Sequence, residues 1–184
     1  MLGLLERPLK PISRPALIGW VIFYVLFLVY AARDTSGFLF IDNANLVVHE
    51  GGHLLFGYFG EWIGVAGGTI LQWLVPLLLA ATFFQQRETQ GVVFCMFFFF
   101  ENWLDTATYM ADARSMSLPL VSAGGGDEII HDWNYLFTSM NCLGSDTAIA
   151  HAVRVGGWIG MIGVVAWMVW FSVKGKGEGA VSPP

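Results

Sequence analysis

The chain has 184 residues, of which 55% are hydrophobic and only 12% are charged, whereas about 25% of the residues of an ordinary soluble domain are charged. This composition excludes an ordinary soluble globular protein and indicates a membrane-embedded one. The net charge is -5, and the nine Lys and Arg residues are scattered along the chain. A nucleic-acid-binding protein is therefore excluded as well, because it needs a clustered basic surface. The two cysteines, Cys95 and Cys142, indicate neither a disulfide framework nor a zinc ribbon.

The first apolar run, Ala16 to Ala32, follows the basic residues Arg7, Lys10 and Arg14. This order resembles a secretory signal, and Val29-Tyr30-Ala31 resembles a cleavage site. We expect the segment to be retained as a membrane anchor.

Further apolar runs follow along the chain. Crossing the hydrocarbon core of a bilayer takes about 20 mostly apolar residues, and four runs reach or approach that length: Pro15 to Ala32, Trp62 to Phe84, Gln90 to Ala111, and Thr147 to Val173. A fifth run, Phe38 to Phe59, is interrupted by the polar residues Asp42, Asn43, Asn45, His49, Glu50 and His53. The sequence thus predicts an all-α, polytopic membrane protein with about five transmembrane or re-entrant helices.

We expect one membrane-embedded domain over residues 1–173 and a solvated tail over residues 174–184. The polar segment 112–146 contains a Gly124-Gly125-Gly126 turn and a short helical run from Asp127 to Cys142, and it is expected to cap the membrane part. The positions of Lys and Arg leave two topologies open. Either all five segments span, or the segment Phe38 to Phe59 re-enters on its own side, which fits the positive-inside tendency better.

The interrupted run carries the motif His49-Glu50-Gly51-Gly52-His53. On a helix, two histidines four residues apart share one face and can bind one zinc ion, with the intervening glutamate beside them as general base. Ionisable groups in a membrane segment cost at least about 2.5 kcal/mol each, and metal ligation offers a compensating reason for them. The two glycines admit another backbone closely, either a substrate strand or a neighbouring helix.

A catalytic zinc site usually has three protein ligands and one open position, so a third ligand must come from elsewhere. Glu101, Asp105, Tyr109 and Asp112 recur at helical spacing and give the run from Gln90 one polar face. Asp105 is the preferred third ligand, because its expected depth matches that of His53 in either topology.

Four other residues are candidates for an additional ligand or for lining the site. They are His131, His151, Arg154 and Glu101. His131 lies in the polar segment that could fold over the site, and His151 shares a helix face with Arg154. Gly64 with Gly68, and Gly156 with Gly160, have the spacing that lets helices pack closely within the chain; a homodimer is a further possibility.

A motif His-Glu-Gly-Gly-His on an apolar helix, followed two apolar segments later by Leu104-Asp105, resembles the site-2-protease class of intramembrane zinc metalloproteases. The resemblance covers roughly Phe38 to Asp112. It implies one zinc ion per chain on His49, His53 and Asp105, with Glu50 as base and a transmembrane protein as substrate.

The sequence therefore favours an intramembrane zinc metalloprotease that hydrolyses peptide bonds in or near the bilayer. A second hypothesis is a non-proteolytic metal-binding subunit of a larger membrane complex, which a closed fourth ligand from His131 or His151 would favour. A third is metal-dependent chemistry on a lipid, since the same zinc-activated water and base serve either carbonyl. Membrane lipids are expected partners in every case, and nucleic acid in none.

Overall fold

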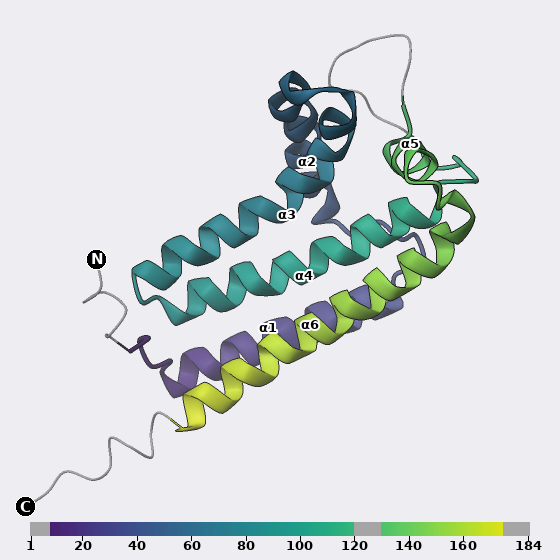
Figure 1. Cartoon of the computed structure of the whole chain (residues 1–184). Coiled ribbons are helices and arrows are strands. Elements are labelled where there is room, and N and C mark those ends of the chain that lie inside the picture. Colours follow the sequence, from purple (N-terminus) through teal and green to yellow (C-terminus); the bar gives the residue numbers. More distant parts are fainter. Residues whose placement is uncertain (1–7, 120–129, 175–184) are drawn as a thin grey trace, which may run out of the picture. The chain divides into compact units, whose positions relative to one another are not determined.

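The apolar runs form helices, and each helix begins and ends close to the point where the sequence changes between polar and apolar residues. The computed structural model describes residues 8–119 and 130–174, and every regular element within them is helical. The helices, labelled in Figure 1, are α1 (Arg14–Arg33), α2 (Asp42–Phe56), α3 (Glu61–Gln85), α4 (Thr89–Ala111), α5 (Asp132–Ser139) and α6 (Asp146–Lys174), with short 3-10 turns η2 (Gly57–Phe59) and η3 (Leu143–Ser145). The prediction of an all-α fold is confirmed.

The four predicted apolar runs agree with α1, α3, α4 and α6 to within one residue at each end. Local chemistry sets these ends. At the start of α1 the hydroxyl of Ser13 accepts a hydrogen bond from the amide of Ala16, and a proline lies in the first turn, where its missing N–H costs nothing. At the start of α6 the carboxylate of Asp146 accepts from the amide of Thr147.

Three helical stretches are long and apolar enough to cross a membrane: Arg14–Arg33, Glu61–Gln85 and Leu143–Lys174. They are compatible with a membrane protein. Helix α4 is not among them, and its second half carries Glu101, Asn102 and Asp105. Helix α2 has 15 residues, so at about 1.5 Å per residue it falls short of the roughly 30 Å of a bilayer core. The predicted number of five crossing or re-entrant segments is therefore not confirmed.

The chain divides into two compact units, and α3, α4 and α6 contribute residues to both. The first unit comprises residues 1–35, 76–99 and 159–184. Its core is aromatic: Tyr24 of α1 and Phe97 of α4 are fully buried, with ring centroids 4.5 Å apart. The indole of Trp20 donates to the side chain of Gln90 at 2.8 Å. The first unit thus joins α1 to the apolar half of α4. The predicted single domain over residues 1–173 stays a prediction.

The second unit comprises residues 36–75 and 100–158, and all of the predicted site residues lie in it. Helix α2 packs on α3 at a glycine contact. A Cβ atom on Gly52 would lie 2.2 Å from the carbonyl oxygen of Gly67, whereas one on Gly51 would meet only the side chain of Leu71, at 3.8 Å. Of the two alternatives that the sequence left open for the motif glycines, a neighbouring helix takes the space at Gly52.

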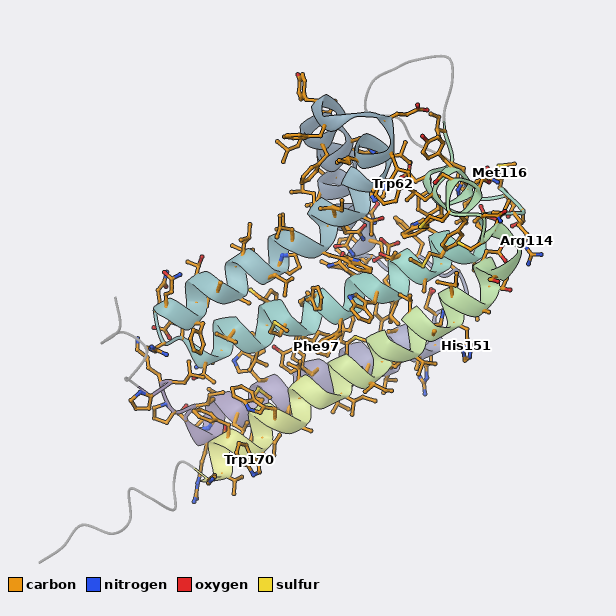
Figure 2. The ribbon with its side chains drawn as sticks, in the orientation of Figure 1. Trp62, Phe97, Arg114, Met116, His151 and Trp170 are labelled. Carbon is orange, nitrogen blue, oxygen red and sulfur yellow. The ribbon has the colours of Figure 1, made fainter. Side chains whose placement is uncertain are left out.

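Helix α5 completes the second unit from within the polar segment 112–146. Its residue Phe137 packs in an apolar cluster with Met110, Ala113 and Ala150, near the C-terminal end of α4 and the start of α6. On its other flank the indole of Trp62, labelled in Figure 2, donates to the hydroxyl of Ser139 at 3.0 Å. The predicted short helix is thus found over Asp132–Ser139, while the Gly124-Gly125-Gly126 turn and the tail after Lys174 lie outside the described residues.

The two adjacent motif glycines give a matched pair of variants. We expect Gly52→Ala to lower stability by about 1–3 kcal/mol, because the new methyl group forces the two backbones apart. Gly51→Ala is expected to leave stability unchanged or to raise it by up to about 1 kcal/mol through helix propensity. Thermal unfolding of both variants in detergent measures the difference, and equal midpoints would contradict the close contact of α2 with α3.

Candidate metal centre

Helix α2 brings the predicted motif residues together. The rings of His49 and His53 have centroids 4.8 Å apart, one helical turn from each other. One ligand atom from each of His49, Glu50 and His53 lies within 4.8 Å of the others. His49 is buried and His53 is partly buried. The imidazole of His49 packs on Gly68, where a Cβ atom would lie 2.5 Å from Nε2. A side chain larger than glycine at that position would therefore displace the ring.

Nδ1 of each imidazole lies beside a hydrogen-bond acceptor, which places a proton on that nitrogen. Nδ1 of His53 lies 2.9 Å from the carbonyl oxygen of Gly64, which can only accept. Nδ1 of His49 lies 3.1 Å from Oε1 of Gln72. The Gln72 amide cannot be reversed, because its Nε2 donates to the carboxylate of Asp105 at 2.6 Å. Both histidines therefore carry a proton on Nδ1, and in the neutral form of each ring the lone pair of Nε2 is available to a metal.

Both Nε2 atoms face the same carboxylate oxygen, which comes from α5. Oδ2 of Asp132 lies 2.8 Å from Nε2 of His49 and 3.1 Å from Nε2 of His53. Burial raises the pKa of Asp132, but hydrogen bonds and charge from the two histidines outweigh it and hold that pKa below its ordinary value. The carboxylate is thus ionised at neutral pH and places a negative charge where two imidazole nitrogens meet.

A second buried pair anchors the residue next to Asp132. Nδ1 of His131 accepts from the amide of Asn134 and caps α5, while its Nε2 lies 3.3 Å from Oδ2 of Asp112. Burial raises the pKa of Asp112, yet hydroxyl and amide donors from Ser115, Leu118 and Ser117 hold it well below its ordinary value. This cluster fixes the start of α5. The amide of Asp132 also donates to the hydroxyl of Tyr109, at 3.1 Å.

The remaining predicted residues lie around this centre. Asp105 is bound to Gln72, on the Nδ1 side of His49, and its assignment as third ligand stays a prediction. Glu101 is fully buried and accepts from Asn45, at 3.2 Å. Both ring nitrogens of His131 have partners: Nδ1 accepts from the amide of Asn134, and Nε2 lies beside the carboxylate of Asp112.

The two candidates on α6 are exposed. The side chain of His151, labelled in Figure 2, faces solvent or lipid. Arg154 is exposed as well, and its guanidinium donates to Thr108 at 3.0 Å. No described contact joins either residue to the two histidines of α2. The roles assigned to His151 and Arg154 stay predictions.

Two residues of the centre were missed by sequence reasoning, and each had a signal. Gln72 is a buried amide inside the apolar run from Trp62 to Phe84, and an isolated amide in such a run needs a polar partner. Asp132 directly follows His131 in the polar segment. From the sequence that histidine was a candidate ligand, and the carboxylate beside it was considered only as a group that could orient a histidine.

The residues present fit a zinc ion. Neutral imidazole nitrogens and carboxylate oxygens are ordinary zinc ligands, and the Nδ1 partners aim both Nε2 lone pairs at one point. The side chain of His53 is 26% exposed, so solvent reaches this side of the centre. Comparisons with family models, with curated proteins and with solved structures give no significant match to the chain.

The anchor of α5 can be tested through Asp112. We expect Asp112→Ala to lower stability by about 3 kcal/mol, because buried donors lose a charged acceptor, whereas Ser115→Ala should cost only about 1 kcal/mol. Since the folded-state pKa of Asp112 is lowered, its contribution is complete above the ordinary pKa of about 4 and is lost as the pH falls through the folded value. Unfolding midpoints of wild type and Asp112→Ala in detergent should therefore begin to approach each other as the pH falls below about 4, and the gap should narrow further toward the folded-state pKa. A gap that persists at low pH would contradict the ionised anchor.

Proposed function

We propose that this chain is a multi-pass integral membrane protein and a zinc-dependent metallopeptidase that hydrolyses peptide bonds in or near the bilayer. The observation that carries the proposal is the convergence of the Nε2 atoms of His49 and His53 with Glu50 alongside, each Nδ1 proton being held elsewhere. The resemblance of the motif to site-2 proteases agrees with this chemistry. The three long apolar helices support a membrane setting.

His49 and His53 would hold the ion, together with a carboxylate as third ligand. Bound zinc supplies a Lewis acid that polarises a carbonyl and lowers the pKa of a water molecule towards 7. Glu50 would take a proton from the attacking water and return it to the amine that leaves when the peptide C–N bond breaks. One of its carboxylate oxygens lies within 4.8 Å of a ring nitrogen of each histidine.

A substrate helix must unwind before it reaches this centre, because its backbone carbonyls are engaged in internal hydrogen bonds. The partial exposure of His53 gives the extended strand an approach from that side. A Cβ atom on Gly51 would meet no backbone of another helix within 4 Å, so a substrate chain would have space to pass close to α2 there.

The alternative is a non-proteolytic metal-binding subunit of a larger membrane complex. A fourth ligand from His131 or His151 would favour it. The partners of His131 and the exposure of His151 do not favour such a closed shell. The catalytic hypothesis therefore has the stronger support.

The proposal is tested by reconstituting the full chain with zinc in liposomes that contain synthetic single-span peptides. In ¹⁸O-labelled water, hydrolysis places the label in the new carboxyl terminus, which mass spectrometry detects. Glu50→Gln should keep its zinc and slow cleavage by about 10²–10⁴-fold, the usual contribution of a general base. Glu61→Gln, at the exposed start of α3, is the matched control and should cleave like wild type.

Two results would contradict the proposal. Cleavage that survives Glu50→Gln at the wild-type rate would remove Glu50 as the base. Zinc binding by wild type without cleavage of any peptide would favour the metal-binding subunit instead.

A further inference from the structure

We infer that Asp132 is the third protein ligand of the metal centre, an assignment that rests on the proposed zinc site at His49 and His53. Its carboxylate oxygen Oδ2 lies 2.8 Å and 3.1 Å from the two Nε2 atoms, and its side chain is only 8% exposed. The sequence analysis placed the third ligand at Asp105, on a different helix. If Asp132 is the ligand, a variant of Asp132 loses the metal. If Asp105 is the ligand, a variant of Asp105 loses it.

The distances around Asp132 are close to those between ligands of one ion. A tetrahedral zinc ion with bonds of about 2.0–2.1 Å places neighbouring ligand atoms about 3.3 Å apart. The two distances from Oδ2 of Asp132 to the Nε2 atoms, 2.8 Å and 3.1 Å, approach this spacing. Only a small outward shift of the carboxylate would make room for the ion at the middle of the three atoms.

The hydrogen-bond network directs three potential ligand atoms to one point. Gln72 and Gly64 hold the Nδ1 protons of the two histidines, so Nε2 of each ring, in its neutral form, presents a lone pair toward Oδ2 of Asp132. Oδ2 of Asp132 presents a lone pair of its own at the same point, 2.8 Å and 3.1 Å from the two Nε2 atoms. Three lone pairs in a buried place repel one another unless added protons or a metal ion lie between them, and a metal ion satisfies all three at once.

Helix α5 holds Asp132 in place independently of the two histidines. The amide of Asp132 donates to the hydroxyl of Tyr109, and the preceding His131 is fixed by Asp112 and by the amide of Asn134. A ligand whose backbone is held in this way loses little conformational freedom when it binds a metal. The polar segment thus supplies a ligand, and His131 serves to orient it.

Asp105 lies on the opposite side of His49. It contacts the amide of Gln72, which faces Nδ1, whereas the metal would bind at Nε2. The two nitrogens of an imidazole point in diverging directions, so Asp105 is placed to orient the ring through Gln72. Carboxylates that act through a metal-bound histidine in this way commonly contribute about 10–100-fold to metal affinity.

The assignment is tested on the full-length protein purified in detergent. Zinc per chain is measured by elemental mass spectrometry, and affinity by competition with a chromophoric chelator. Cobalt(II) replaces zinc in a parallel series, because its visible absorption reports the number and type of ligands. The variants are Asp132→Asn and Asp105→Asn, with His49→Ala as the variant that lacks a ligand and Glu61→Gln as the matched carboxylate-to-amide control. Gel filtration and thermal unfolding establish that each variant is folded.

We expect one zinc per chain in wild type and in Glu61→Gln, and more than a 100-fold loss of affinity in Asp132→Asn, as in His49→Ala. Asp105→Asn should lose about 10–100-fold and keep the wild-type cobalt spectrum. Asp132→His, which restores a ligand atom, should regain binding with a changed cobalt spectrum. A residue that merely supports the fold would not produce that change.

Wild-type affinity and an unchanged cobalt spectrum in Asp132→Asn would overturn the assignment. If Asp105→Asn then lost the metal, Asp105 would be the ligand and the proposed function would stand. Conversely, loss of zinc in Asp132→Asn together with failure of wild type to cleave any peptide would uphold the ligand and overturn the peptidase. Absence of zinc from wild type, even after zinc is supplied, would overturn both.

Discussion

The two Nδ1 protons of His49 and His53 are committed to acceptors outside the centre, and the chemistry of the site follows from that constraint. The carbonyl of Gly64 and the amide of Gln72 hold these protons, so in the neutral form of each ring it is Nε2 that carries the lone pair. Without the carboxylate of Asp105 the Gln72 amide could turn over and present a donor to His49. A residue at some distance from the proposed metal position thus determines which nitrogen of His49 faces it.

Close packing of α2 on α3 makes these acceptors available. Gly52 lets the backbone of Gly67 approach within a distance that no side chain would allow, and Gly68 leaves room for the ring of His49. The carbonyl of Gly64 and the side chain of Gln72 lie on the same helix, α3, on either side of this contact. The motif glycines therefore serve the histidines directly, because a wider spacing between the helices would separate each Nδ1 from its acceptor.

Much of the fold could be predicted from the sequence, whereas the composition of the site could be predicted only in part. Long apolar runs have few alternatives to a helix, so the ends of α1, α3, α4 and α6 were predictable. The grouping of His49, Glu50 and His53 followed from helical periodicity alone. Asp132 lies 83 residues from His49 in the chain, and no local pattern specifies which of many distant carboxylates folds back. Adjacent residues on a short helix point apart, so the choice between His131 and Asp132 depends on packing against Asp112, which lies outside any local motif.

Helix α4 shows how one segment serves both an apolar and a polar environment. Its first half contributes Phe97 to the aromatic core of the first unit, while Glu101 and Asp105 of its second half belong to the buried polar network of the second. Buried polar groups are costly unless they are paired, so the polar half requires partners that lipid cannot provide. Helices α2 and α3 supply them through Asn45 and Gln72. The same pairing that makes the polar half of α4 tolerable also orients His49. For this reason the stability of the second unit and the geometry of the candidate metal centre depend on the same contacts.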